Sequence, residues 1–285
     1  IEIGGKVLIA EFNNLAEQAH GSVTLRYGNT VVLATAVMGK EEKNVDFFPL
    51  TVEYEERFYA SGKILGSRFI RREGKPTDEA ILSGRIVDRT IRPLFEHHIR
   101  NEVQVVLTVL SIDEDDPDVV SVIGASLALG TSDIPWNGPV SAVRIGHNNG
   151  FHINPSYIER KKADISLDLV ACGKDGNINM IEVAGKECDE KELGMALVKA
   201  SEEIEKIQKW QENIIKEIGK VKRVIEKPKL PSGMEELFNS NILIKLKDSI
   251  FNKKESENDI HFEQIKKDWL KIFQEKYPED NKGIA

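Results

Sequence analysis

The residues best suited to chemistry are arginines that stand close to aromatic side chains in the first hundred positions. One group lies in a glycine-bounded segment, and the other lies in the helix predicted to follow it. The candidate binding residues are Phe69, Ile70, Arg71, Arg72, Arg85, Arg89 and Arg92. An aromatic ring can stack on a base, and guanidinium groups hold phosphates through paired hydrogen bonds. This combination is typical of a site for single-stranded nucleic acid that needs no base-specific reading.

The second group of arginines is spaced for one face of a helix. Thr77 supplies an N-cap followed by two acids, which predicts a helix that runs to about Arg92. Arg85, Arg89 and Arg92 are four and three residues apart, so they would form a cationic stripe on that helix. The charge pattern alone is equally consistent with a solvated face on which these arginines pair with acids such as Asp88.

An acidic run at residues 113–118 is a second candidate for chemistry. Adjacent carboxylates would repel a bound phosphate, and an ion such as Mg²⁺ is the less common reason for such a run. The commoner reason is a solvated loop in which Asp118 caps a helix that ends near Gly130. Asp168, at the end of a predicted strand, is interpreted as a turn or salt-bridge residue. No metal site is therefore predicted in this chain.

Histidine and cysteine give no sign of a metal or redox site. The six histidines show no spacing that pairs them with cysteine or carboxylate as zinc ligands. Cys172 and Cys188 are too few for a disulfide framework and too far apart for a redox pair. We predict that both are reduced, structural thiols.

Composition limits the classes of protein that remain. With 40% apolar and 30% charged residues, the 285-residue chain is typical of a soluble protein with one domain and a smaller appendage. It has no uninterrupted apolar run of about 18 residues and no signal peptide at its start, so neither membrane insertion nor export is expected. The net charge of -8 argues against broad electrostatic binding of duplex nucleic acid, so any RNA contact has to be local.

Strand and helix patterns predict a mixed sheet packed with helices. The predicted strands are residues 23–27, 30–37, 47–54, 103–110, 165–172 and 178–184. The first two flank a turn at Gly28 and Asn29, and 103–110 is apolar enough to be buried on both faces. A long helix capped at Asp189 follows the last strand. The predicted domains are residues 1–227 and an all-helical domain at 228–285.

The aromatic and arginine segments also carry a family resemblance. The stretches that carry it are Asp46–Tyr54, Arg68–Pro76 and Arg85–Phe95, with further similarity at 137–139 and 167–171. Over about residues 1–220 the chain resembles the first RNase PH-like domain of the polynucleotide phosphorylases. The resemblance implies an α+β fold of the ribosomal protein S5 domain 2-like type, a mixed β-sheet packed with helices. A small all-helical linker domain is implied to follow.

The resemblance also implies where RNA and catalysis belong. Where the family usually has Phe-Phe-Arg-Arg, a loop implied to contact RNA in the channel of a trimer, this chain has Phe69-Ile70-Arg71-Arg72. Ile70 removes a stacking plane, which is worth about 1 to 3 kcal/mol per base. The family's active second copy has a serine-rich phosphate loop and an Asp-x-Lys. This chain has carboxylates at 113–118 and Val170 in the place of that lysine, so no catalytic residue is expected.

The intact protein implied by the resemblance is a cytoplasmic 3′-to-5′ phosphorolytic exoribonuclease that acts in mRNA degradation. It would convert RNA and inorganic phosphate to nucleoside diphosphates, with Mg²⁺ bound outside this chain. This part is expected to bind single-stranded RNA and to support assembly of a homotrimer. The catalytic centre is expected in a second domain that this chain lacks, so the chain alone is expected to be inactive.

Three alternatives remain open at the level of sequence. A non-catalytic ring subunit of the exosome type would complete an active site on a separately encoded partner. A free-standing phosphorolytic enzyme would need a phosphate cradle and metal carboxylates that the sequence does not offer. A pure assembly module would use its arginines to stabilise a trimer, and RNA affinity would then be insensitive to Arg71 and Arg72.

Overall fold

Two compact units make up the chain in the computed structural model, which describes residues 1–64, 76–161, 165–227, 231–252 and 255–278. Contacts divide it into Ile1–Ile225 and Glu226–Ala285. The predicted boundary after residue 227 stays a prediction that truncation can test. None of the described helices combines the length and the apolar character that a membrane span requires.

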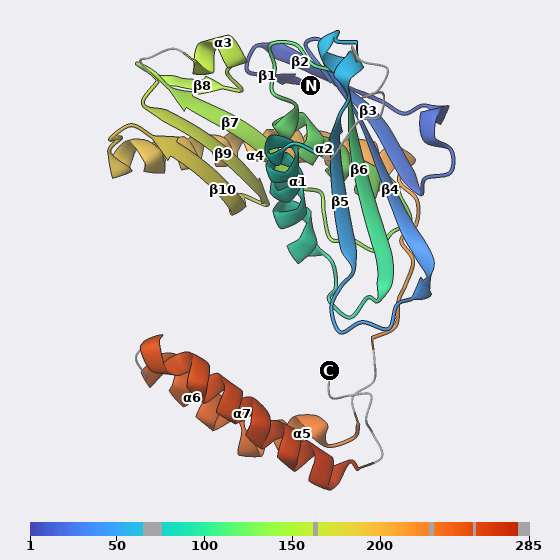
Figure 1. Cartoon of the computed structure of the whole chain (residues 1–285), viewed down its shortest axis with the longest axis vertical. Coiled ribbons are helices and arrows are strands. Elements are labelled where there is room, and N and C mark those ends of the chain that lie inside the picture. The colour runs from blue at the N-terminus through green and yellow to red at the C-terminus, as the bar shows by residue number, and fades with distance from the viewer. Residues whose placement is uncertain (65–75, 162–164, 228–230, 253–254, 279–285) are drawn as a thin grey trace. The chain divides into compact units, whose positions relative to one another are not determined.

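The first unit contains a six-stranded mixed sheet (Figure 1). Its strands are β1 (Glu2–Ile3), β2 (Lys6–Glu11), β3 (Gly21–Tyr27), β4 (Thr30–Glu42), β5 (Leu50–Glu56) and β6 (Asn101–Ser111). In the order β1-β2-β3-β4-β6-β5, only β5 and β6 are parallel neighbours. The predicted hairpin is present, because Tyr27 pairs with Thr30 across the turn at Gly28 and Asn29. Among the described residues, β5 is the edge strand on this side.

A second, antiparallel sheet has four strands in the order β10-β9-β7-β8. They are β7 (Ser141–His147), β8 (Phe151–Ile153), β9 (Leu167–Lys174) and β10 (Asn177–Gly185). The two predicted strands of this region are present as β9 and β10. The sequence predicted one sheet, whereas the structure has two, since β7 pairs with β8 and β9 and not with the first sheet.

Helices fill and cover the space around the sheets (Figure 1). The helices of the first unit are α1 (Asp78–Ile91), α2 (Pro117–Thr131), α3 (Tyr157–Arg160) and α4 (Glu190–Ile218). Helix α2 is buried along almost its whole length because it packs on β3 and β4 of one sheet and on β7 of the other. Helix α4 covers β7 and β9, and α1 packs on β5 and α2. The core of the unit therefore lies around α2.

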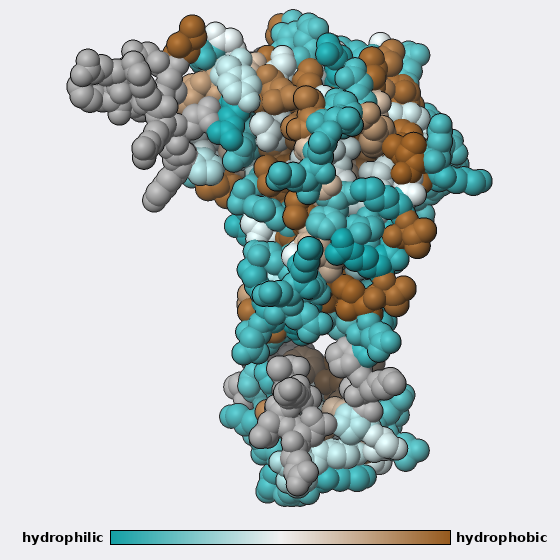
Figure 2. Space-filling view, turned by 90° about the vertical axis from the view of Figure 1, so that its right-hand side faces the viewer, coloured by the Kyte–Doolittle hydropathy of each residue, from teal (hydrophilic) through white to brown (hydrophobic). Residues whose placement is uncertain are grey.

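Two strand predictions need correction. β5 starts at Leu50 and not at Phe47, because Pro49 lacks the N–H that a ladder needs and Phe48 turns into the core against Phe95. β6 is not buried on both faces. Its side chains alternate between buried and half-buried, since α2 covers one face of the sheet. The side of the first unit seen in Figure 2 shows hydrophobic residues in separate groups among hydrophilic ones.

After α4 the chain crosses the end of α2 as an extended segment, residues 219–225, which we call the strap. The Lys222 ammonium donates to the carbonyls of Leu129, Gly130 and Ser132 at 2.6, 3.0 and 2.8 Å. The last carbonyls of a helix lack the usual partner four residues on, and a lysine is suited to bind them. The Leu129 carbonyl also accepts from the Ser132 hydroxyl at 2.7 Å. Burial lowers the pKa of Lys222 to about 8. Arg223 adds an ion pair with Asp133.

The second unit is all-helical, as the sequence predicted. Its helices are α5 (Met234–Asn241), α6 (Leu243–Asn252) and α7 (Glu255–Lys276). Aromatic contacts hold α5 to α7, because the rings of Phe238 and Trp269 meet edge to face with their centroids 5.2 Å apart. Phe273 is buried and lies between Trp269 and Tyr277. The unit thus has a small core of its own.

Candidate nucleic-acid interface

The predicted loop contacts lie outside the described residues. Phe69, Ile70, Arg71 and Arg72 fall within 65–75, so their part in RNA binding stays a prediction. The described part of the candidate interface begins at Pro76, which leads into α1.

Helix α1 forms where the sequence supplies both a cap and an apolar face. Thr77 is the predicted N-cap, and its hydroxyl accepts a hydrogen bond of 3.1 Å from the backbone N–H of Ala80. The residues buried against the fold are Ala80, Gly84, Ile86, Val87, Thr90 and Ile91. Because that face is anchored, the backbone under Arg85 and Arg89 on the other side of the helix is held in place.

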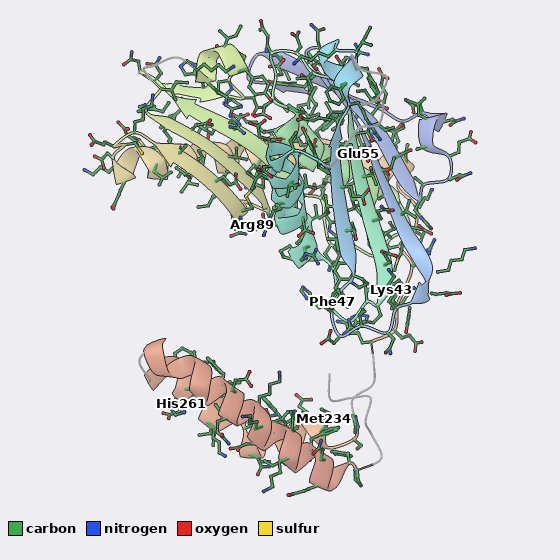
Figure 3. All side chains as sticks on the ribbon, viewed as in Figure 1. Lys43, Phe47, Glu55, Arg89, Met234 and His261 are labelled. Carbon is green, nitrogen blue, oxygen red and sulfur yellow. The ribbon has the colours of Figure 1, made fainter. Side chains whose placement is uncertain are left out.

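Arg85 and Arg89 are exposed on the outer face of α1, opposite its buried residues. Figure 3 labels Arg89 on this helix. The two arginines are one helical turn apart and point to the same side. Neither forms a hydrogen bond or an ion pair with any residue that the structure describes. Two guanidinium groups on a rigid support are therefore available to an anionic ligand.

Arg92 is used within the fold. It follows the last residue of α1, and its Nη2 and Nε lie 2.6 and 3.0 Å from the carboxylate oxygens of Asp88. Its Nη1 and Nη2 also donate to the carbonyls of Phe48 and Leu50 at 3.3 and 3.1 Å. Four of the five N–H groups of this guanidinium are thus engaged in tying α1 to the start of β5. The charge pattern had left open that these arginines pair with acids, and Arg92 does so with Asp88.

A groove of about 570 Å³ runs between α1 and the edge strand β5. Arg85, Asp88 and Arg92 line it from α1 and its end, and Glu53 and Glu55 line it from β5. The groove has the volume of a small-molecule site, but its charges are mixed. The carboxylates on β5 disfavour a polyanion inside the groove, so a phosphate backbone fits better on the outer face of α1.

The acidic run at 113–118 is solvated only at its start, because Asp113 and Glu114 are exposed and the residues from Asp115 on are covered. Asp115 is buried and accepts a hydrogen bond from Lys6, while Asp116 and Asp118 are largely covered. The N-cap of α2 is Asp116 and not Asp118, because the Asp116 side chain accepts from the backbone N–H of Asp118 at 2.9 Å. Pro117 takes the first helical position, where its missing N–H costs nothing. The prediction of a solvated loop therefore holds for Asp113 and Glu114 and is wrong for residues 115–118, and the predicted capping residue was wrong.

Two arginines that the sequence reasoning did not use neutralise these carboxylates. Arg144 on β7 lies 2.9 Å from Asp116 and 3.1 Å from Asp168. Arg160 at the end of α3 contacts the same two carboxylates, with 3.1 Å between its Nε and Asp168. The interpretation of Asp168 as a salt-bridge residue is confirmed. A lone arginine in the apolar stretch Ser141–Gly146 was the available signal, because an arginine there needs a buried acid.

Asp118 is the member of this cluster that is least well neutralised. Its carboxylate is 3.5 Å from Arg144, farther than Asp116 or Asp168. Burial, and then the neighbouring charge of Asp116, raise the pKa of Asp118 to about 7. A side-chain hydrogen bond with Ser83 on α1 and the two arginines act in the opposite direction. The cluster thus links α2 with β7, α3, β9 and α1.

The N-terminal end of α2 is consequently filled by the chain's own side chains. A phosphate there would meet Asp116 and Asp118, and Mg²⁺ would have to displace arginines from carboxylates that they already bind. Val170, in the place of the family's lysine, is buried in β9. Within the described ranges no group of three or more His, Cys, Asp or Glu side chains is arranged to hold a metal ion. Neither ligand fits these residues.

Cys172 and Cys188 do not form a disulfide with each other. Cys172 is fully buried in β9, and burial raises the pKa of its thiol to about 12. Cys188 is free and half-buried. Neither cysteine takes part in a disulfide in the described structure, and their reduced state stays a prediction.

Comparisons with known proteins agree with this fold. The family model of the 3′ exoribonuclease family, domain 1 (RNase PH), matches residues 5–135. In structure, the chain is similar to an Archaeoglobus fulgidus exosome solved with RNA bound to its active site, with a TM-score of 0.57 at 22% identity over 73% of this chain and 89% of that one. It is also similar to rice (Oryza sativa) Rrp46, with a TM-score of 0.59 at 14% identity over 73% and 94%. These likenesses define the class as an RNase PH-like α+β domain.

Closer relatives narrow the class to one family. A polyribonucleotide nucleotidyltransferase of Heliobacterium modesticaldum is 42% identical over 287 residues, which span 100% of this chain and 40% of the relative. That of Geobacillus kaustophilus is 46% identical over 248 residues, 85% of this chain and 34% of the relative. The chain belongs to the polyribonucleotide nucleotidyltransferase family. It spans less than half the length of these relatives.

Proposed function

We propose that the chain is the N-terminal part of a 3′-to-5′ phosphorolytic exoribonuclease of mRNA degradation, and that this part binds single-stranded RNA without carrying the catalytic centre. The intact protein would release nucleoside diphosphates from RNA and inorganic phosphate. Family membership supports the reaction. A homotrimer, a cytoplasmic location and Mg²⁺ bound outside this chain belong to the same proposal and rest on family membership alone.

The observation that carries the non-catalytic role is the ion-pair cluster at the start of α2. Helix N-termini bind phosphate through free N–H groups and a positive dipole end. Here the Asp116 carboxylate occupies that end, and Arg144 and Arg160 bind the carboxylates. Inorganic phosphate would have to enter against two aspartates, so phosphorolysis is expected elsewhere in the intact protein.

The observation that supports RNA binding is the pair of unpaired arginines on α1. In sequence, Arg85 and Arg89 lie ten and fourteen residues after the end of the segment 65–75, which holds Phe69, Arg71 and Arg72. Arginine planes and an aromatic ring can hold bases and phosphates of a single strand without reading its sequence. Arg92 contributes indirectly, through the position of α1, because its own donors are engaged.

Binding and catalysis can be tested separately on the 285-residue chain. Anisotropy of a labelled oligoadenylate should show binding that falls about tenfold or more in Arg71→Ala/Arg72→Ala and in Arg85→Ala/Arg89→Ala, because each variant removes two phosphate contacts. Arg26→Ala is the matched control, since Arg26 is an exposed arginine on β3. Equal affinity in all three variants would contradict the proposed interface.

The catalytic part of the proposal has its own readout. The same RNA is incubated with Mg²⁺ and inorganic phosphate, and nucleoside diphosphate release is measured. No release is expected from this chain. Phosphate-dependent release would show that the cluster at the start of α2 does not exclude the reaction, and would favour a free-standing phosphorolytic enzyme.

A further inference from the structure

The outer face of α1 has an arrangement of charge that a second copy of the same helix would complement. Along one stripe it carries Asp78 in the first turn, Ile81 and Leu82 in the middle, and Arg85 two turns from the start. Ile81 and Leu82 are 48% and 57% exposed, although they are large apolar side chains on a well-anchored helix. The stripe is thus acidic at one end, apolar at the centre and basic at the other end.

Neither charge of this stripe is satisfied within the described chain. Asp78 and Arg85 are both exposed and form no hydrogen bond or ion pair with any described residue. They lie on the same side of the helix, but seven residues correspond to a rise of about 10.5 Å, which is too far for a direct contact. A partner has to come from outside the helix.

We propose that α1 is a self-association face on which two copies of this chain pack their α1 helices antiparallel about a twofold axis. With the axis between positions 81 and 82, Asp78 of each copy lies opposite Arg85 of the other. Ile81 of each copy then meets Leu82 of the other. A twofold contact repeats every pair, so one register forms two identical ion pairs around an apolar centre.

This contact is distinct from the homotrimer proposed above, because a ring of three closes through heterologous contacts and not through a twofold one. It also does not depend on RNA binding. The contact area of one helix pair falls in the small class of interfaces, below about 1,200 Å², so we expect weak association with a Kd on the order of micromolar. Because Arg85 would serve both contacts, RNA is expected to shift dimers toward monomers.

The structure offers a charge-swap test that only an antiparallel self-contact passes. Sedimentation equilibrium of the 285-residue chain at low salt should give a concentration-dependent monomer–dimer equilibrium. Arg85→Asp should weaken it about tenfold or more, since it places like charges opposite each other in both pairs. Asp78→Arg/Arg85→Asp should restore it to within about threefold of the original, because each pair is rebuilt with its charges exchanged.

Apolar variants separate this proposal from the RNA proposal. Leu82→Ser should weaken dimerisation at least tenfold, while RNA affinity measured at protein concentrations well below the dimer Kd stays unchanged. Val198→Ser, at an apolar position 62% exposed on α4, should alter neither. Circular dichroism and thermal unfolding of each variant confirm that α1 and the fold are retained. Three results would overturn the self-association face: a chain that stays monomeric up to about 100 µM, a dimer whose Kd is unchanged by Leu82→Ser, or a dimer that the charge swap does not restore. None of them would bear on RNA binding by Arg71, Arg72 and Arg89.

Discussion

Among the features of single residues, buried charge has the largest expected effect on the stability of this domain. Asp116, Asp118 and Asp168 share two arginines, so the cluster holds three acids against two bases when all are ionised. Such a cluster is costly to break, because removal of one partner leaves an uncompensated charge in a poorly solvated place. Arg144 is the central member, since it is buried and contacts all three carboxylates.

Replacement of Arg144 by Met should therefore destabilise the first unit by about 3 to 5 kcal/mol. The methionine keeps much of the volume but leaves Asp116 and Asp168 with only Arg160. Urea unfolding followed by circular dichroism measures the change. Arg26→Met, at an exposed position on β3, is the matched control and should change the free energy of unfolding by less than about 0.5 kcal/mol. A loss below 1 kcal/mol in Arg144→Met would mean that the cluster is solvated.

Asp118 predicts a pH dependence of stability with a definite sign. Its pKa is about 7 in the fold, against an ordinary value of 3.8 for an aspartate, so between about pH 4 and pH 7 the native state keeps a proton that the unfolded state has lost. Stability contributed by this group is therefore present at low pH and is lost as the pH rises through 7, by on the order of 1 kcal/mol per unit of pKa shift.

Asp118→Asn tests this directly. The amide keeps the shape without a charge, so the variant should unfold at higher urea than the original chain at pH 8, and the difference should shrink towards pH 5. Asp46→Asn, at an exposed aspartate, should follow the original chain at both pH values. A variant that is less stable than the original at pH 8 would show that the ionised Asp118 is well paired after all.

At the scale of elements, close approach between α2 and the first sheet decides how the layers pack. A Cβ at Gly21 on β3 would lie 2.0 Å from the carbonyl oxygen of Ala128 on α2, so the backbones would have to separate. A Cβ at Gly84 on α1 would lie 3.5 Å from the Cβ of Tyr54, an ordinary contact. Substitution by alanine is therefore expected to lower the stability of the fold at Gly21 and to be tolerated at Gly84.

Gly21→Ala should cost about 1 to 3 kcal/mol through overpacking against backbone. Gly84→Ala should be neutral or stabilising by up to about 1 kcal/mol, because alanine is the better helix former and has room. Thermal and urea unfolding of both variants measure the difference. If the two variants were equally stable, the separation of β3 and α2 would be adjustable, and α2 would not be a fixed spacer between the sheets.

Local signals in the sequence were sufficient for most elements and for the placement of Arg85 and Arg89 on an exposed helix face, whereas their role in binding stays a prediction. The Gly28–Asn29 turn, the Thr77 cap and the Asp189 cap act between neighbouring residues, and each is present in the structure. The separation into two sheets and the pairing of Arg144 with Asp116 depend on contacts between residues far apart in sequence, so periodicity could not reveal them. The choice of Asp116 over Asp118 as N-cap depended on one residue of register, which composition does not fix.

For the whole molecule, the strap explains where the first unit can be cut. Residues 219–225 belong to that unit, because Lys222 binds three carbonyls at the end of α2 and Arg223 binds Asp133. His98 also contacts the carbonyl of Ile225 through its ring nitrogen at 3.3 Å. From Glu226 on, the residues belong to the second unit by their contacts. The stability of the first unit should therefore depend on the strap and not on the helices that follow.

Two truncations test this division. A chain of residues 1–227 should keep the unfolding midpoint of the first unit, whereas a chain of residues 1–218 should lose about 2 to 4 kcal/mol, because carbonyls at the end of α2 lose their donors. Lys222→Met within residues 1–227 should reproduce a large part of that loss, which separates the lysine from chain length. If 1–218 were as stable as 1–227, the strap would be a passive linker. If 1–227 were itself unstable, the boundary near residue 227 would be wrong, and the α-helical unit would have to be counted as part of the first fold.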